Sequence, residues 1–185
     1  MSPTSRAAVF LDRDGVLNEA LVTDGRPASP RRVEELRVIE TARTACTQLR
    51  AHGLLLLVVT NQPEIARGTL SQAEAESIND VLRREVPVDS VYVCAHDDAA
   101  GCQCRKPKPG LLLTAAAEWD VDLTASFMVG DRWRDIEAGE RAGCTTVFID
   151  GHYAERRPSG FAMTGSSLAD VTPWILARHA QSSAA

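Results

Sequence analysis

A short apolar run near the start of the chain, Ala7–Leu11, ends directly in two aspartates, Asp12 and Asp14, followed by Gly15. A run of this kind predicts a buried strand of a parallel sheet. Side chains two apart on a strand point the same way, so both aspartates emerge together at its carboxyl end, and Gly15 permits a sharp turn. Ligands of open parallel sheets bind beyond the carboxyl ends of the strands, which makes these acids candidate site residues. Taken alone, an acidic turn that caps a strand would explain the same pattern.

The rest of the chain alternates between strand-like and helix-like segments. Strands are expected at 7–11, 54–59, 88–93, 125–129 and 145–149, and helices at 33–51, 71–85, 111–119, 132–142 and 168–180. A flap or short hairpin is expected at 23–30, a loop at 94–110 and irregular structure at 152–165. This order predicts an α/β fold: a doubly wound, Rossmann-like, mainly parallel sheet with helices on both faces.

Length and charge limit the class of protein. The 185 residues, 44% of them hydrophobic, are enough for one globular domain spanning residues 1–185. A net charge of -5 argues against nucleic acid or an anionic membrane as a general partner. No apolar run is long enough to span a membrane, and residues 1–6 lack the features of a signal peptide. We therefore expect a cytoplasmic protein whose 5 cysteines stay reduced.

Carboxylates at two separated strand ends suggest chemistry on a phosphate ester. Asp12 is a candidate nucleophile because a carboxylate is ionised at neutral pH without an activating base. An anion that attacks an anionic phosphoryl group needs a divalent cation such as Mg²⁺, for which Asp131 is the natural second carboxylate. Asp135, one helical turn later, could hold a metal-bound water or Lys106. For Asp131, a helix N-cap is an equally common use of aspartate.

Three further residues have roles in the same scheme. Asp14 would protonate the leaving oxygen and later deprotonate the attacking water, a task that requires a raised pKa. Thr60, at the end of the second strand, can donate its hydroxyl to a phosphoryl oxygen, although strand propensity alone would explain it. Lys106, in a proline-stiffened stretch, offers a compact positive charge, and a solvated basic turn is the alternative.

Together, these motifs resemble the haloacid dehalogenase superfamily of phosphohydrolases. The resemblance covers about residues 7–150: Asp-x-Asp-Gly after the first strand, Thr-Asn after the second, Lys before a helix and Gly-Asp-x-x-x-Asp after the fourth. It implies that Asp12 is the nucleophile, Asp14 the acid/base, and Thr60 and Lys106 the phosphoryl stabilisers. It also implies that Asp12, the backbone carbonyl of Asp14, and Asp131 bind Mg²⁺.

Three of the five cysteines lie close together in the chain with one histidine among them. Cys94, His96, Cys102 and Cys104 form two tight pairs of ligands that suit tetrahedral Zn²⁺. Because protein would fill all four positions, the ion should be structural and hold the loop that carries Lys106. Scattered free cysteines are the alternative.

This loop, continued by Cys-Arg-Lys-Pro-x-Pro-Gly, is similar to a group within that superfamily that includes heptose 1,7-bisphosphate phosphatases and histidinol-phosphate phosphatases. The similarity implies a capless, monomeric, Mg²⁺-dependent enzyme, with Asn61, Arg105 and Arg132 at substrate-contacting positions. Three features depart from the group's pattern and concern specificity. They are Pro63-Glu64 in place of Ser-Gly, the missing Gly-Tyr at 19–22, and a short stretch, 97–101, between the two ligand pairs.

The expected function is therefore a Mg²⁺-dependent phosphatase that acts on a small phosphorylated sugar, with heptose bisphosphate as the leading substrate. Histidinol phosphate and other small phosphoesters are the enzymatic alternatives. A non-catalytic module that binds a protein through its zinc loop is an alternative of another class, although binding alone would not need the full set of catalytic residues.

Overall fold

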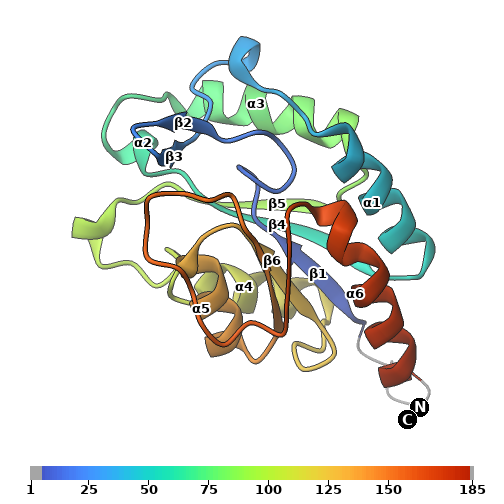
Figure 1. Ribbon diagram of the computed structural model, residues 1–185. Helices are drawn as coiled ribbons and strands as arrows, with labels where there is room; N and C mark the ends of the chain where they lie inside the picture. Colours follow the sequence, from blue (N-terminus) through green and yellow to red (C-terminus); the bar gives the residue numbers. More distant parts are fainter. Residues whose placement is uncertain (1–5, 184–185) are drawn as a thin grey trace.

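A six-stranded parallel sheet forms the centre of the molecule (Figure 1). The computed structural model describes residues 6–183. The strand order is β5-β4-β1-β6-β7-β8. The strands are β1 (Ala8–Leu11), β4 (Leu55–Asn61), β5 (Ser90–Cys94), β6 (Phe127–Gly130), β7 (Thr145–Ile149) and β8 (Met163–Gly165). From β1 the chain adds β4 and β5 on one side of the sheet, and then returns to add β6, β7 and β8 on the other side. A crevice forms where the strand order reverses in this way, and the carboxyl ends of β1, β4 and β6 border it. The predicted α/β fold is confirmed.

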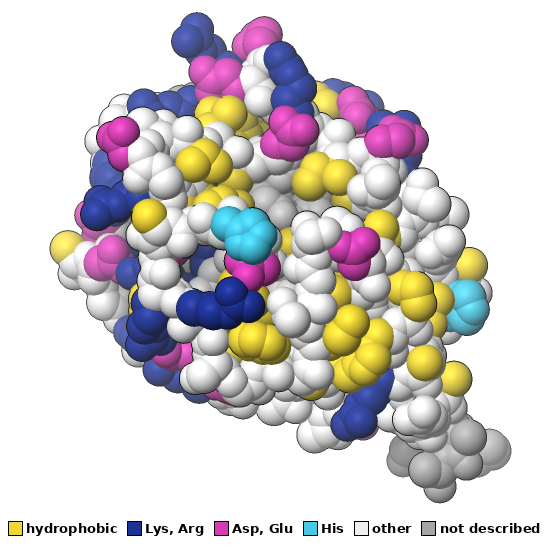
Figure 2. All heavy atoms as spheres, in the orientation of Figure 1, with side chains coloured by type: hydrophobic (Ala, Val, Ile, Leu, Met, Phe, Trp, Pro, Cys, Tyr) yellow, Lys and Arg dark blue, Asp and Glu magenta, His cyan; other side chains and the backbone are white. Residues whose placement is uncertain are grey.

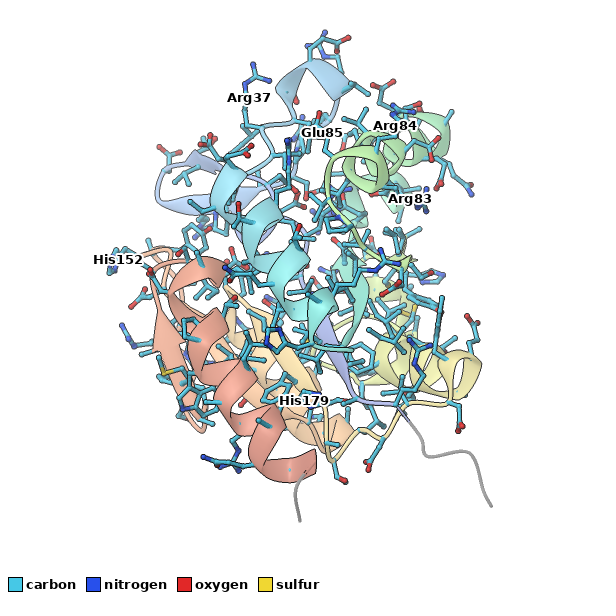
Figure 3. All side chains as sticks on the ribbon, turned by 90° about the vertical axis from the view of Figure 1, so that its right-hand side faces the viewer. Arg37, Arg83, Arg84, Glu85, His152 and His179 are labelled. Atoms are coloured by element: carbon cyan, nitrogen blue, oxygen red, sulfur yellow. The ribbon has the colours of Figure 1, made fainter. Side chains whose placement is uncertain are left out.

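Helices cover both faces of the sheet, as the buried pattern of the strands requires. Val9 and Leu11 face α1 (Glu40–Ala51) and α6 (Leu168–Ser183), which lie side by side (Figure 3). On the other face, Ala8 and Phe10 pack with α4 (Gly110–Trp119) and, through Ala138, with α5 (Trp133–Ala142). α3 (Gln72–Glu85) joins the α1 side through Leu82. Because successive strand residues feed two separate cores, each strand is a continuous apolar run rather than an alternating one.

Small elements surround the carboxyl edge of the sheet. The expected hairpin is present as β2 (Leu21–Thr23) and antiparallel β3 (Arg26–Ala28). The others are η1 (Val33–Glu35), α2 (Pro63–Ala66) and η2 (Asp98–Ala100). Ser71 accepts a hydrogen bond from the Glu74 backbone N–H, so the predicted N-cap of α3 is confirmed.

Two expected segments differ from the prediction. The helix expected at 33–51 is continuous only from Glu40, because residues 36–39 run beside the turn after β1. There, Ile39 N donates to Leu17 O at 2.9 Å and Glu19 N donates to Arg37 O at 2.8 Å. The stretch 152–165, expected to be irregular, ends in β8, which extends the sheet beside β7. Both differences arise from pairing between distant segments, which local periodicity does not report.

Within residues 6–183, no helix combines the length and the hydropathy that crossing a membrane would require. The expected absence of a signal peptide concerns residues 1–6, of which 1–5 lie outside the described part.

Candidate active site

The turn after β1 brings both aspartates to the carboxyl edge of the sheet. Gly15 N donates to Asn18 O at 2.7 Å, and Leu17 N donates to Arg13 O at 2.9 Å. Gly15 has φ +83°, and a Cβ added there would lie 1.9 Å from Asp131 Oδ2. Both the left-handed backbone and the close approach therefore require glycine. The tight turn lets Asp131, from the end of β6, lie directly against the β1 turn.

Three buried carboxylates and one ammonium form the base of the site. Ligand oxygens of Asp12, Asp131 and Asp135 all lie within 4.8 Å of one another. Lys106 Nζ contacts Asp12 Oδ1 at 2.9 Å, Asp135 Oδ1 at 2.6 Å and the carbonyl of Val59 at 2.7 Å. With all four side chains ionised, the cluster has a charge of two negative units in a buried space, which a divalent cation would balance.

The oxygens of Asp131 point to the same conclusion. Both are buried, and neither has a hydrogen bond of normal geometry within residues 6–183, although the Tyr153 hydroxyl lies close enough to influence the carboxyl. A buried carboxylate without donors is costly unless a cation or water coordinates it. The donor set therefore fits a hard, oxygen-preferring cation.

Crowding of negative charge shifts the pKa values of this cluster. Burial, helped by Asp135, raises the pKa of Asp12 to about 6 despite the opposing charge of Lys106. Burial and the charges of Asp12 and Asp135 raise the pKa of Asp131 well above its ordinary value. For Lys106, burial works to lower the pKa, but the two aspartates outweigh it and raise the pKa, so the ammonium stays charged.

The pKa of Asp14 is lowered, whereas the acid half of its predicted role requires a raised pKa. Burial works to raise it, but the charge of Arg13 and hydrogen bonds from Arg13, Asn18 and Ser29 together outweigh burial. The fully buried Arg13 contacts both Asp14 oxygens at 3.1 Å, and Asn18 Nδ2 donates to Asp14 Oδ1 at 2.9 Å. Asp14 is therefore held as a carboxylate in this state.

Residues at and just after the end of β4 contact both Asp14, in the turn after β1, and the backbone of Lys106. Gln62 Nε2 donates to Thr60 Oγ1 at 2.9 Å and to Asp14 Oδ2 at 3.0 Å. The Asn61 side chain donates to Lys106 O at 3.0 Å and accepts from Lys106 N at 3.1 Å. Thus Asn61 positions the backbone of Lys106, and its expected substrate contact stays a prediction.

The predicted substrate arginines, Arg105 and Arg132, line the same open pocket as Asp12 and Asp14. Each has a partner within the protein. Arg132 Nε donates to Glu155 Oε2 at 2.9 Å, and Arg132 Nη2 donates to Glu155 Oε1. Arg105 Nε donates to Asp98 Oδ1 at 2.9 Å.

The four predicted soft ligands converge as the sequence spacing suggests. Cys94 Sγ lies 3.2 Å from Cys104 Sγ and 3.7 Å from Cys102 Sγ, and His96 Nδ1 lies 3.3 Å from Cys104 Sγ. Zn–S bonds of about 2.3 Å in a tetrahedron would separate the sulfurs by about 3.8 Å, close to this spacing. The cluster lies directly before Arg105 and Lys106 and fits a structural metal.

Sequence reasoning missed several residues of the site. Arg13 lies between the two motif aspartates. Because successive side chains on a strand point to opposite faces, the sequence gave no sign that Arg13 would pair with Asp14. Gln62 lies two residues beyond Thr60, and that spacing could have suggested a shared face. Tyr153 and Glu155 lie in the segment expected to be irregular, which carries no periodic signal.

Comparisons with known proteins agree with this geometry. The family profile described as HAD-hydrolase-like matches residues 103–160. The D-glycero-beta-D-manno-heptose-1,7-bisphosphate 7-phosphatase of Pasteurella multocida is 38% identical over 74% of this chain and 77% of its own length. The Yersinia pestis enzyme of that name is 33% identical over 93% and 96%. The crystal structure of a D,D-heptose 1,7-bisphosphate phosphatase from B. bronchiseptica, complexed with magnesium and phosphate, superposes with a TM-score of 0.78, 29% identity, and coverage of 92% and 98%.

Proposed function

The chain belongs to the haloacid dehalogenase-like phosphatases, and within that family we propose that it removes the 7-phosphate of a heptose 1,7-bisphosphate. Curated relatives 33–38% identical to this chain carry that activity in their names. We further propose that the chain is a single domain without an inserted cap, and that it is active as a monomer in the cytoplasm. The segment between Asp14 and the start of β4 at Leu55 supports the absence of a cap, since its regular elements are the β2–β3 hairpin, η1 and α1.

The observation that carries the proposal is the meeting of Asp12, Lys106, Asp131 and Asp135 beside Thr60 in one pocket. Asp12 would attack phosphorus and form an aspartyl phosphate. Lys106, held between two carboxylates, and the Thr60 hydroxyl would stabilise the phosphoryl oxygens. Mg²⁺, held by Asp12, Asp131 and the carbonyl of Asp14, would neutralise charge on the phosphoryl group. Asp135 would orient Lys106, the second of its two predicted alternatives.

Asp14 would transfer protons in both half-reactions. As a carboxylate it is suited to take the proton of the water that hydrolyses the aspartyl phosphate. To protonate the leaving oxygen it must first acquire a proton, which Arg13 opposes. The negative charge of a bound phosphate would raise the pKa of Asp14 and favour that protonation.

Zn²⁺ would be held by Cys94, His96, Cys102 and Cys104 as a structural ion. This role follows from the closed set of four protein ligands. By fixing the loop between β5 and α4, the ion would hold the backbone on which Arg105 and Lys106 stand.

The test is phosphate release in Mg²⁺ from heptose 1,7-bisphosphate, each heptose monophosphate and histidinol phosphate. We expect the bisphosphate to have the highest kcat/KM. Asp12→Asn should lose at least about 1000-fold in kcat, because it removes the nucleophile. Asp80→Asn, on the exposed face of α3, is the matched control and should keep full activity.

Two outcomes would contradict the proposal at different levels. Similar slow turnover of every compound would contradict heptose 1,7-bisphosphate as the substrate but would still agree with phosphatase activity. Release of no phosphate from any member of a broad phosphoester panel would instead favour a binding module.

A further inference from the structure

One wall of the active-site pocket has more positive than negative charge. Three arginines line the pocket: Arg67, Arg105 and Arg134. The positive charges of all three help to lower the pKa of one carboxyl group, that of Asp98. Arg105 Nε lies 2.9 Å from Asp98 Oδ1, and Arg134 Nη2 lies 3.9 Å from the same oxygen. In Figure 2, Lys and Arg side chains gather on the left-hand side of the molecule, mixed with Asp and Glu, over the segment between β5 and α4.

The single carboxylate is poorly placed to neutralise these arginines. The Asp98 side chain is 64% exposed, so water weakens its ion pairs. Glu64 also lines the pocket, but no ion pair within residues 6–183 joins it to these arginines. Even with Glu64 counted, three guanidinium groups face two carboxylates. This wall therefore favours an anion.

Arg132 differs from this wall because its own carboxylate neutralises it. Glu155 accepts from two nitrogens of Arg132, and both side chains are partly exposed, at 32% for Arg132 and 21% for Glu155. A forked guanidinium–carboxylate pair leaves fewer donors for a ligand. The pair presents both donors and acceptors, which suits hydroxyl groups better than a second phosphate.

The position of Arg134 is set by stacking rather than by pairing. Its guanidinium carbon lies 4.4 Å from the centre of the Trp133 ring, and 25% of its side chain is exposed. Arg156 lies 4.2 Å from the same ring but pairs with Glu137 and does not line the active-site pocket. Stacking fixes the plane of a guanidinium while leaving its N–H edge free to donate. Arg134 thus has a defined orientation and no strong internal partner other than the distant Asp98.

We infer that Arg134 is a specificity-determining residue that binds a second phosphate group of the substrate, which takes the place of Asp98. This inference rests on the proposed function and deepens it. It assigns the distal phosphate to the wall of Arg67, Arg105 and Arg134, and assigns the Arg132–Glu155 pair to hydroxyl groups between the two phosphates.

The experiment compares heptose 1,7-bisphosphate with heptose 7-phosphate in the Mg²⁺-loaded enzyme. Arg134→Gln should lower kcat/KM for the bisphosphate about tenfold, mainly through KM, because a charge-assisted contact is lost. The same variant should change kcat/KM for the 7-phosphate less than about twofold. Asp98→Asn should lower KM for the bisphosphate, because it removes the competing carboxylate. Arg156→Gln is the matched control: it stacks on the same ring, lies outside the pocket, and should leave both substrates unaffected.

Other results would overturn the inference. If Arg134→Gln lowers kcat/KM equally for both substrates, Arg134 has a general structural role. If kcat/KM is unchanged for both substrates, Arg134 does not contact the second phosphate. The same pattern in Arg156→Gln would assign the effect to the packing of Trp133. If the wild type hydrolyses neither compound, the proposed function itself fails, which distinguishes that failure from failure of the Arg134 contact.

Discussion

At the scale of single residues, Arg13 has the greatest effect on the site among those that sequence reasoning missed. It is fully buried, contacts both oxygens of Asp14, and donates from Nη1 to Asn79 Oδ1 at 2.9 Å. A buried guanidinium of this kind is retained only where its charge and donors are matched. Arg13 therefore both ties the motif turn to α3 and determines the charge of Asp14.

Arg13→Leu should lower the free energy of unfolding by about 3–5 kcal/mol, because it leaves the largely buried Asp14 carboxylate without its partner. Urea unfolding at pH 7 measures the change. Arg83→Leu, which removes exposed pairs with Glu76 and Asp80, is the control and should cost less than about 1 kcal/mol. Equal costs for the two variants would show that burial of the Arg13–Asp14 pair does not matter.

The same pair predicts a pH dependence. Since the folded-state pKa of Asp14 lies below 3.8, its pairing stabilises the fold above the unfolded-state pKa, and that stabilisation is lost as the pH falls through the folded-state pKa. The difference in unfolding free energy between wild type and Arg13→Leu should be complete at pH 7 and should shrink below about pH 4. A difference that stays constant over that range would contradict the assigned pKa direction.

Gly15 gives a prediction about activity. A Cβ there would lie 1.9 Å from Asp131 Oδ2 and 2.8 Å from the Tyr153 hydroxyl, so Gly15→Ala must displace Asp131. We expect a loss of about 100-fold or more in kcat, measured as phosphate release. Gly53→Ala is a close control, because Gly53 has the same φ of +83° but no atom within 4 Å of its added Cβ. It should cost stability through backbone strain and leave kcat unchanged.

At the scale of elements, segments that lack regular structure do much to shape the pocket. The end of β5 and the stretch between β5 and α4 provide the Cys/His cluster, Asp98, Arg105 and Lys106. The segment between β7 and β8 provides Tyr153 and Glu155, and Ala154 N donates to Gly25 O of the hairpin at 2.8 Å. His152, in the same segment, points away from the body of the molecule (Figure 3). The loops that follow β5 and β7 therefore supply residues that line the pocket.

Loss of one soft ligand should disturb the β5–α4 loop. Cys102→Ser is expected to lower bound zinc below one ion per chain, as measured by elemental analysis, and to speed hydrogen exchange at 95–105. Activity should fall as well, because Lys106 stands on this loop. Cys144→Ala, which lies outside the cluster, is the control and should retain zinc. Unchanged zinc content in Cys102→Ser would contradict the four-ligand site.

At the scale of the whole molecule, the part of the hydrophobic core under α6 lies away from the candidate active site. The core beneath α6 includes the fully buried Ile175 and Val171, whereas the site lies at the carboxyl edge of the sheet. Ring contact between Phe127 and Trp174, with centroids 6.4 Å apart, joins α6 to β6. The helix therefore closes one face of the sheet without contributing to the pocket.

Ile175→Ala should reduce the free energy of unfolding by about 2–5 kcal/mol, because it leaves a cavity in the core. Well below the unfolding transition, kcat should match that of the wild type. Urea unfolding and phosphate release measured on the same sample test both statements. Leu113→Ala, at an exposed position of α4, should change stability by less than about 0.5 kcal/mol. A fall in kcat for Ile175→Ala would show that α6 influences the site.

Local patterns in the sequence were sufficient for five of the six strands of the sheet and for most helices, and the order of the motifs identified the residues that meet around Lys106. Apolar runs such as 7–11 identify buried strands because both faces of the sheet are covered, and polar residues at their carboxyl ends identify the crevice. The spacing of Cys94, His96, Cys102 and Cys104 likewise determined a cluster that the fold brings together. These features depend on neighbours in the chain, so the order of residues reports them directly.

Only the tertiary structure decided the charge state of Asp14, the break in the helix expected at 33–51, and the strand β8. It also decided the partners of Arg132 and Arg134. Each depends on which distant side chain or backbone lies nearby: Arg13 closes on Asp14, Leu17 pairs with Ile39, and Glu155 reaches Arg132. Electrostatic and pairing energies of this kind depend on separation in space, about which local sequence periodicity contains no information.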